Sequence, residues 1–194
     1  MIKNIIFDFG GVISRKTKYN KLSKSLSQFT PEEKKIIKAK IKKYARLCRI
    51  AKISDNEYFQ KIKEELGLNE PLNKIKQDFY SSQKVNKKII HLIKELKKDY
   101  KVFLLTNHMK GWFAYQNKKY KLNKIFNGII TSFDAGIAKP NTSIYKKLLN
   151  KYKLSPKECL FIDNLQKNLN PAKKLGMRVI LYKPRMNLEK EVKK

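Results

Sequence analysis

The sequence predicts an α/β protein with a Rossmann-like, doubly wound parallel sheet and an inserted all-α segment. Three observations lead to this prediction. Short apolar runs alternate with helical patterns from residue 85 to residue 182, which is the order that a parallel sheet requires. One further apolar run, residues 2–7, comes first and is followed by about seventy residues of helical pattern. Polar side chains directly follow several apolar runs, as they do where open α/β sheets bind ligands.

Each predicted strand is a short apolar run, and each helix between strands has apolar residues three and four positions apart. The strands are expected at 2–7, 101–105, 128–131, 158–162 and 177–182. The helices between them are expected at 89–96, 111–121, 141–152 and 165–175. The last residues, 186–194, are mostly charged and are expected to fray.

The inserted segment contains three helix patterns. Thr30 precedes a proline and two glutamates, which is typical of an N-cap followed by a first helical turn. Ser54 opens a second helix with the spacing of a capping box, and Gly67 ends it. A third, short helix is expected at 72–80. We therefore expect two domains, a core formed by 1–14 and 84–194 and a helical cap formed by 15–83.

Composition limits the class of protein. With 194 residues and 41% hydrophobic content, the chain suits one domain with a modest insertion. Its apolar runs are only a few residues long and no signal-peptide pattern precedes Asp8, so we expect a soluble, cytoplasmic protein that does not bind membranes. Cys48 and Cys159 lack metal-ligand spacing and are expected to be small buried hydrophobic residues.

The formal net charge is +30, from 46 basic and 16 acidic residues. Only five basic residues are arginine, which leaves 41 lysines spread over the whole chain. Surfaces that bind nucleic acid specifically favour arginine and gather their charge in patches. A coding bias toward lysine therefore explains the charge better than nucleic-acid binding does, although that partner stays an alternative. In either case the field attracts small anionic molecules.

Four junctions between predicted elements carry polar side chains, and these are Asp8, Thr106-Asn107, Lys139-Pro140 and Asp163-Asn164. We expect all of them at the carboxyl ends of parallel strands. Carboxylates, a hydroxyl, an amide and an ammonium together supply what phosphoryl transfer needs: a nucleophile, ligands for a divalent cation and positive charge around the transferred oxygens. Each group alone is also compatible with a helix cap.

These segments resemble the four motifs of the haloacid dehalogenase-like (HAD) hydrolase superfamily. In order, the segments are Phe7-Asp8-Phe9-Gly10-Gly11-Val12-Ile13, Leu104-Leu105-Thr106-Asn107, Gly136-Ile137-Ala138-Lys139-Pro140 and Phe161-Ile162-Asp163-Asn164. The helical insertion after the first motif is similar to that of the subclass with an α-helical cap. The chain most resembles the branch that contains small sugar-phosphate (α-glucose-1-phosphate) phosphatases and the N-terminal phosphatase domain of epoxide hydrolases.

The resemblance implies a Mg²⁺-dependent phosphatase that hydrolyses a small phosphorylated metabolite, such as a sugar phosphate. Asp8 would attack phosphorus and form an aspartyl-phosphate. The same resemblance implies that Mg²⁺ would be held by Asp8, the carbonyl of Gly10, Asp163 and Asn164. Hard oxygen ligands of this kind suit Mg²⁺.

The resemblance also implies a phosphate-binding set. Thr106 would donate its hydroxyl to a phosphate oxygen, and Asn107 would donate its backbone N–H. Lys139 would bind the phosphate and act in catalysis by neutralising charge between the phosphate and the carboxylates. Together with Mg²⁺, it would keep Asp8 ionised beside a second acid.

The chain departs from the family pattern at two positions. Many relatives carry an aspartate two residues after the nucleophile as a general acid and base, and this chain has Gly10 there. Such help is worth about 10²–10⁴-fold, so we expect a preference for good leaving groups, as in anomeric sugar phosphates and acyl phosphates. Asn164 stands where relatives often have a second acid, which predicts weaker Mg²⁺ binding.

Two other functions stay open. A metal-independent 2-haloacid dehalogenase would use Asp8 against a carbon–halogen bond, although Asp163 would then have little purpose beside it. A non-catalytic HAD-fold protein would bind nucleic acid or another anionic partner through its lysines. The identity of the phosphate ester and the oligomeric state are also open.

Four further residues are candidates for the site. His108 follows the second motif, and we consider it as a replacement for the missing acid because imidazole titrates near neutrality. Arg46 and Arg49, near the end of the first cap helix, either form a solvated face or bind an anionic substrate. Trp112 is expected to pack, with a place at the border of the pocket as the alternative.

Overall fold

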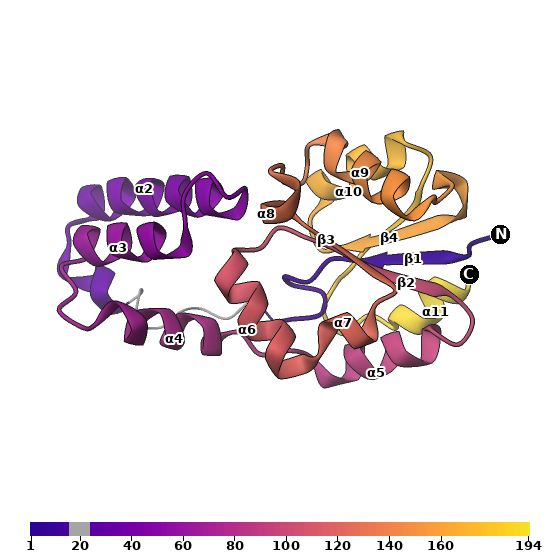
Figure 1. The fold of residues 1–194 in the computed structure, drawn as a ribbon, viewed down its shortest axis with the longest axis horizontal. Coiled ribbons are helices and arrows are strands. Elements are labelled where there is room, and N and C mark those ends of the chain that lie inside the picture. The colour runs from indigo at the N-terminus through magenta and orange to yellow at the C-terminus, as the bar shows by residue number, and fades with distance from the viewer. Residues whose placement is uncertain (16–23) are drawn as a thin grey trace.

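The computed structural model describes residues 1–15 and 24–194. At its centre lies one five-stranded sheet with the strand order β3-β2-β1-β4-β5 (Figure 1). Every neighbouring pair of strands runs parallel, so the predicted doubly wound sheet is confirmed. The strands are β1 Asn4–Phe7, β2 Lys101–Thr106, β3 Gly128–Thr131, β4 Cys159–Asp163 and β5 Arg178–Leu181.

Helices cover both faces of the sheet. The helices of one face are α5 Lys87–Leu96, α7 Leu122–Ile125 and α11 Leu188–Lys193, and those of the other are α9 Thr142–Tyr152 and α10 Gln166–Lys174. Successive strand residues point to opposite faces, so Phe7 and Leu104 pack in the first cluster while Ile6 and Phe103 pack in the second. Strands that are apolar on both sides are typical of a parallel sheet covered by helices.

Three helices form a separate layer beside the sheet (Figure 1). They follow the short 3-10 helix η1 and are α2 Pro31–Arg49, α3 Asp55–Glu65 and α4 Leu72–Ser82. Both predicted helix starts are confirmed as capping boxes. The Thr30 hydroxyl accepts the Glu33 N–H at 3.3 Å while the Glu33 carboxylate accepts the Thr30 N–H at 2.8 Å, and Ser54 and Glu57 form the same pair. Residues 16–23 of the predicted insertion lie outside the described residues.

The helical layer shares its hydrophobic cluster with the core. The cluster contains residues of α2, α3 and α4, but also Met109, and Trp112 and Tyr115 pack against it. Met109 precedes α6 Lys110–Tyr120, and the other two residues lie on that helix. The inserted helices therefore meet α6 of the core through an apolar contact that the sequence pattern did not reveal.

A carboxylate reinforces this junction. Asp55, the first residue of α3, accepts the Gly111 N–H at 3.1 Å and the Tyr80 hydroxyl at 2.6 Å. A Cβ at Gly111 would lie 2.5 Å from the Tyr80 hydroxyl oxygen and 2.9 Å from the Asp55 carboxylate. Only glycine allows this close approach between α6 and the inserted helices.

The prediction for the C-terminal residues was wrong. Instead of fraying, they form α11, whose Leu188 and Val192 are buried against the first cluster. Asn187 caps this helix by accepting the Lys190 N–H at 3.0 Å. The apolar face of this helix is narrow, so it is hard to recognise in a sequence that is mostly charged. Burial of that face orders the segment.

Several smaller features complete the fold. Two one-turn helices, α7 and α8 Ser132–Ala135, were not predicted because a single turn is too short to show a period. Cys48 and Cys159 are buried and unpaired, as expected. No helix among residues 1–15 and 24–194 is long and apolar enough to cross a bilayer.

Candidate active site

The site lies at the topological switch point of the sheet. β1 pairs with β2 on one side and with β4 on the other, and the chain changes direction across the sheet at this point. Phe7 lies opposite Ile162 in the register, so Asp8 and Asp163, the next residues along the two strands, come side by side. The Asp8 N–H donates to the Ile162 carbonyl at 2.9 Å. Both aspartates are buried.

Lys139 joins the two carboxylates. Its Nζ lies 2.7 Å from Asp8 Oδ1 and 2.8 Å from Asp163 Oδ2, and its side chain is only 1% exposed. The ammonium also lies 5.2 Å from the centre of the Phe161 ring, within the range of a cation–π contact. Two negative charges and one positive charge thus form one buried cluster. Its net negative charge favours the binding of a further cation.

The cluster changes the acidity of Asp8. Burial raises the pKa of the Asp8 carboxyl to about 6, because desolvation disfavours the charged form. The Lys139 ammonium opposes this change by favouring the carboxylate, and Asp163 adds to it by repulsion. With a pKa of about 6, Asp8 is mostly ionised at neutral pH and is available as a nucleophile.

Asn107 positions Lys139 through its backbone. The Asn107 side-chain Nδ2 donates to the Lys139 carbonyl, and its Oδ1 accepts the Lys139 N–H, both at 2.9 Å. From the sequence, only the backbone N–H of Asn107 was expected at the site. The side-chain clamp was not predicted, because the partner loop lies 32 residues away along the chain. Thr106, the last residue of β2, is buried at the same edge of the sheet.

Asn168 is a site residue that sequence reasoning missed. It lies on the buried side of α10 and donates from Nδ2 to Asp163 Oδ2 at 2.9 Å. The Asn168 carbonyl in turn accepts the Tyr145 hydroxyl at 2.6 Å. Asp163 Oδ1 accepts the Leu165 N–H at 2.9 Å. In the sequence, the only indication of these contacts to Asp163 was an asparagine five residues after it.

The oxygen atoms around the cluster fit a hard divalent cation. Asn164 Oδ1 is buried and has no hydrogen-bond partner among the described residues. Asn164 packs closely on Gly11, which has a φ of +94° and whose Cβ, if present, would lie 2.5 Å from the Asn164 Nδ2. The Asp8 and Asp163 carboxylates, the Gly10 carbonyl and this amide would together supply oxygen ligands of the type that Mg²⁺ prefers.

This donor set differs from a purely acidic metal centre. The part of the chain that the structure describes contains no group of three or more His, Cys, Asp or Glu side chains able to hold a metal. The predicted Mg²⁺ ligands do not require one, because two of the four are a backbone carbonyl and an amide. Such a set carries less charge than a three-carboxylate site, and weaker Mg²⁺ binding stays a prediction.

His108 does not replace the missing acid. Its ring stacks on Trp112 with the ring centres 4.5 Å apart and meets Phe9 edge-on at 5.3 Å. Burial, with a smaller contribution from Arg49, lowers the pKa of His108 to about 3, so the imidazole is neutral near pH 7. The hypothesis that His108 supplies a labile proton is therefore wrong, because the sequence shows the position of a histidine but not its desolvation.

The two arginines of α2 have different environments. Arg46 is exposed. Arg49 ends the helix, and its carbonyl accepts the Ser132 hydroxyl at 2.6 Å. The same hydroxyl oxygen accepts the His108 N–H at 3.0 Å, so the end of α2 meets the loop after β2. Trp112 packs in the shared cluster, as expected.

The structure is therefore a Rossmann-like α/β fold with inserted helices, and its candidate site is the buried carboxylate–lysine cluster at the switch point. The chain matches the family model for haloacid dehalogenase-like hydrolases over residues 5–182. It therefore belongs to this family, which confirms the resemblance seen in the motifs.

Similar proteins support this assignment. The chain is 30% identical over 144 residues to the bifunctional epoxide hydrolase 2 of Sus scrofa, covering 70% of this chain and 26% of that protein. It thus spans about a quarter of that relative. It is 26% identical over 188 residues to the D-ribitol-5-phosphate phosphatase of Bacteroides thetaiotaomicron, covering 91% of this chain and 89% of that one.

A solved structure shows the same fold. The crystal structure of a HAD family enzyme from Bacteroides thetaiotaomicron has a TM-score of 0.86 and 22% identity, and the match covers 100% of this chain and 99% of that one. Another crystal structure of that enzyme contains magnesium and inorganic phosphate, and its TM-score is 0.80. The predicted Rossmann-like fold with inserted helices is thereby confirmed.

Proposed function

We propose that the protein is a Mg²⁺-dependent phosphatase that hydrolyses a small phosphorylated metabolite through an aspartyl-phosphate on Asp8. The observation that carries this proposal is the buried cluster of Asp8, Lys139 and Asp163 at the switch point of the sheet. Membership of a hydrolase family supports it. So does the similarity to a phosphatase over nearly the whole length of both chains.

The proposed reaction has two steps. Asp8 attacks the phosphorus atom, the bond from phosphorus to the leaving oxygen breaks, and the phosphoryl group stays on the carboxylate. Water then attacks this acyl phosphate, which releases inorganic phosphate and restores Asp8. Mg²⁺, held by Asp8, Gly10, Asp163 and Asn164, would supply positive charge at the transferred oxygens.

The other groups prepare Asp8 for attack. Lys139 keeps the carboxylate ionised and faces the transferred oxygens, while Asn107 fixes the loop that carries this lysine. The Thr106 hydroxyl and the backbone N–H of Asn107 would bind the phosphate. We also propose that residues 15–83 act as a cap over residues 1–14 and 84–194, because closure over the site would exclude water.

Three buried polar atoms support a polar leaving group. Arg49 Nε, His108 Nε2 and Trp112 Nε1 have no hydrogen-bond partner within the described residues. They belong to one neighbourhood, because His108 stacks on Trp112 and feels the charge of Arg49. Buried polar atoms of this kind are normally satisfied by water or a ligand. A hydroxylated or anionic leaving group, as in a sugar phosphate, would satisfy them where the inserted helices meet the core.

Gly10 leads us to propose a preference for substrates with good leaving groups. The position is exposed, and a Cβ there would meet no atom within 4 Å. Glycine has no side chain that can protonate the departing oxygen, and an aspartate would have room at this position. Anomeric sugar phosphates and acyl phosphates need less protonation than alkyl phosphates, so they should be hydrolysed faster. Gly10→Asp should raise turnover of alkyl phosphates most, by up to about 10²–10⁴-fold.

A screen of phosphorylated metabolites with Mg²⁺, run beside Asp8→Asn, tests the proposed function. We expect phosphate release by the natural protein and none by the variant. Phosphate release that survives Asp8→Asn would refute the mechanism. Chloride release from a 2-haloacid without Mg²⁺ would instead establish the dehalogenase alternative.

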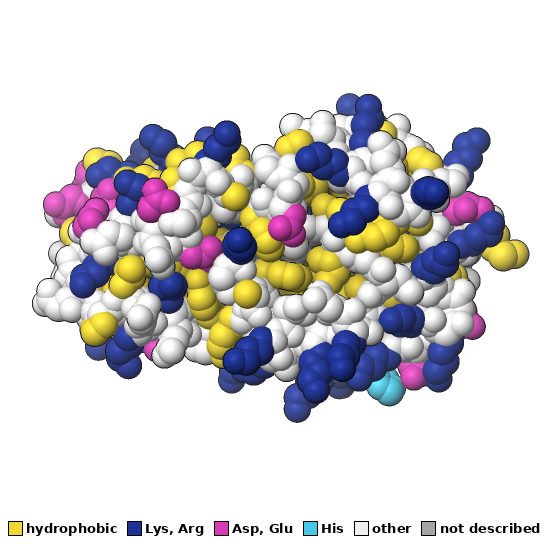
Figure 2. Space-filling model, in the orientation of Figure 1, with side chains coloured by type: hydrophobic (Ala, Val, Ile, Leu, Met, Phe, Trp, Pro, Cys, Tyr) yellow, Lys and Arg dark blue, Asp and Glu magenta, His cyan; other side chains and the backbone are white. Residues whose placement is uncertain are grey.

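The non-catalytic alternative has less support. Lys and Arg side chains are distributed over the whole face seen in Figure 2 instead of forming one patch, whereas nucleic-acid surfaces concentrate their charge. Nucleic acid retained through purification, steep salt dependence of its binding and no phosphate release would together favour this alternative.

A further inference from the structure

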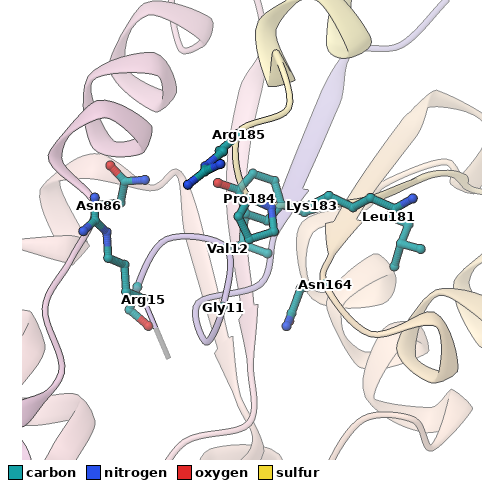
Figure 3. A pocket seen from close by; sticks show the side chains of 11 residues that line it. Gly11, Val12, Arg15, Asn86, Asn164, Leu181, Lys183, Pro184 and Arg185 are labelled. Atoms are coloured by element: carbon teal, nitrogen blue, oxygen red, sulfur yellow. The ribbon is translucent and has the colours of Figure 1, made fainter. Parts of the chain in front are cut away.

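A cavity lies beside the loops that follow β1 and β4. Its volume is about 820 Å³, within the usual range for sites that bind small molecules. Four segments line it: the turn after β1 up to Arg15, Asn86 at the start of α5, Asn164 after β4, and residues 181–185 at the end of β5 and after it. Figure 3 shows side chains from all four segments around it. The cavity reaches Gly11 and Asn164, but the carboxylate–lysine cluster does not line it.

The charged groups of this cavity are all positive. Arg15, Lys183 and Arg185 line it, and its described lining contains no acidic residue. Among the described residues, neither guanidinium has a hydrogen-bond or ion-pair partner. Two of the five arginines in this lysine-rich chain therefore meet at one cavity, with donors that no described residue occupies. A guanidinium group can donate two parallel hydrogen bonds to the oxygens of one phosphate, whereas an ammonium group acts as a point charge.

Two further features of the lining are compatible with a binding site for an anion. Arg185 has a φ of +70°, a conformation that is uncommon for arginine and is often found near functional sites. Asn86 Oδ1 accepts the Lys88 N–H at 3.1 Å, which leaves the amide hydrogens of Asn86 to donate. Figure 3 shows Arg15, Asn86 and Arg185 gathered on one side of the cavity.

The cavity also has an apolar part. Val12, Leu181, Tyr182 and Pro184 contribute to it, beside the polar Ser14 and Asn164. Inorganic phosphate alone would leave this surface in water. A planar organic group can cover it, because aromatic and proline rings offer flat apolar faces. The combination of free guanidinium groups and an apolar surface fits an organic polyphosphate better than a simple anion.

From this arrangement we infer that the cavity binds a nucleoside polyphosphate. The phosphates contact Arg15, Arg185 and the Asn86 amide, and the base lies against Tyr182 and Pro184. The occupant would touch both connections to the inserted helices. These connections are already paired, through Arg15 N–H to the Lys84 carbonyl at 3.1 Å and Asn86 N–H to the Ile13 carbonyl at 2.7 Å. The inference does not depend on the proposed phosphatase activity.

Calorimetric titration of the full chain with ATP tests this inference. The titration is run in EDTA, so that ATP is not hydrolysed by a metal-dependent reaction. We expect Arg15→Gln/Arg185→Gln to weaken ATP binding about 100-fold, since each lost charge-assisted contact is worth about tenfold or more. Arg46→Gln, which removes the same charge from an exposed site on α2, should leave the affinity unchanged.

Three results would overturn the inference. If the control Arg46→Gln lost as much affinity for ATP as Arg15→Gln/Arg185→Gln, the binding would reflect general attraction to a positive surface. Loss of ATP binding in Lys139→Ala, with retention in Arg15→Gln/Arg185→Gln, would place the nucleotide in the catalytic cluster. Equal affinity for ATP and tripolyphosphate would show that the apolar surface does not bind the base, whereas burial of the base predicts a gain in affinity on the order of tenfold.

A second variant serves if the double glutamine variant does not fold. Arg15→Lys/Arg185→Lys keeps both charges but loses the paired N–H donors of the guanidinium groups, so it should bind ATP with intermediate affinity.

Discussion

His108 should make the stability of this protein depend on pH below 7. Its pKa falls from an ordinary value of 6.5 to about 3 because the ring is buried against Trp112 and Phe9, with Arg49 nearby. One pKa unit corresponds to about 1.4 kcal/mol. Protonation of the unfolded chain therefore lowers the free energy of unfolding by about 2 kcal/mol at pH 5 and about 4 kcal/mol at pH 3.

The sign of this effect follows from proton binding. Between pH 6.5 and about 3, the unfolded chain binds a proton at His108 and the folded chain does not. The free energy of unfolding therefore falls as the pH falls through this range. Above pH 6.5 the imidazole is neutral in both states, and its contribution to the pH dependence disappears.

Urea unfolding at pH 7, 6 and 5 measures this effect, with Trp112, the single tryptophan, as the fluorescent reporter. The free energy of unfolding should fall between pH 7 and pH 5 by about 2 kcal/mol more in the natural protein than in His108→Asn. Any constant loss of packing in the variant cancels in this comparison. His91, the other histidine, is exposed on α5, and His91→Asn should keep the natural pH dependence. Parallel pH profiles for the natural protein and His108→Asn would refute the reasoning.

Three further substitutions test the site and the junction. Lys139→Met leaves two buried carboxylates without their cation, and we expect a loss of about 3–5 kcal/mol in unfolding free energy and of about 10²–10³-fold in phosphate release. Asn164→Asp should tighten Mg²⁺ binding, measured by calorimetry, by about tenfold because it adds a charge to the oxygen set. Gly111→Ala should lower the unfolding free energy by about 1–3 kcal/mol, because its Cβ would crowd Tyr80 and Asp55.

Each of these expectations has its own control. Lys139→Arg keeps the charge in a larger side chain, so it should retain more stability than Lys139→Met, and equal stability of the two would contradict the ion-pair argument. Unchanged Mg²⁺ affinity in Asn164→Asp would remove Asn164 from the ligand set. Gly10→Ala has open space around its Cβ and should unfold like the natural protein. If Gly111→Ala did the same, the close approach to the inserted helices would be unimportant.

The two carboxylates of the carboxylate–lysine cluster could be predicted from their positions at the ends of apolar strands. Asp8 and Asp163 each close an apolar strand, and parallel strands bring their carboxyl ends to one edge. Lys139 was harder to find, since it is one of 41 lysines, and only its motif distinguished it. The pattern of apolar residues therefore predicts where a side chain lies along the sheet. It does not say which distant polar groups will satisfy that side chain.

The supporting contacts could not be predicted in this way. Asn107 clamps the backbone of Lys139, and Asn168 holds Asp163, across separations of 32 and 5 residues. Each contact depends on the relative placement of two elements to within a hydrogen-bond length. Hydrophobic period specifies the face of an element but not its axial position, so such contacts appear only in three dimensions.

The amino-acid order alone determined the alternation of strands and helices, the capped starts of α2 and α3, and the family motifs, because these depend on local preferences and on burial patterns of short period. Tertiary packing decided the rest. It lowered the pKa of His108, ordered α11 on the sheet, and brought Arg15 and Arg185 to one cavity, since desolvation and proximity arise only when segments far apart in the chain share one interior.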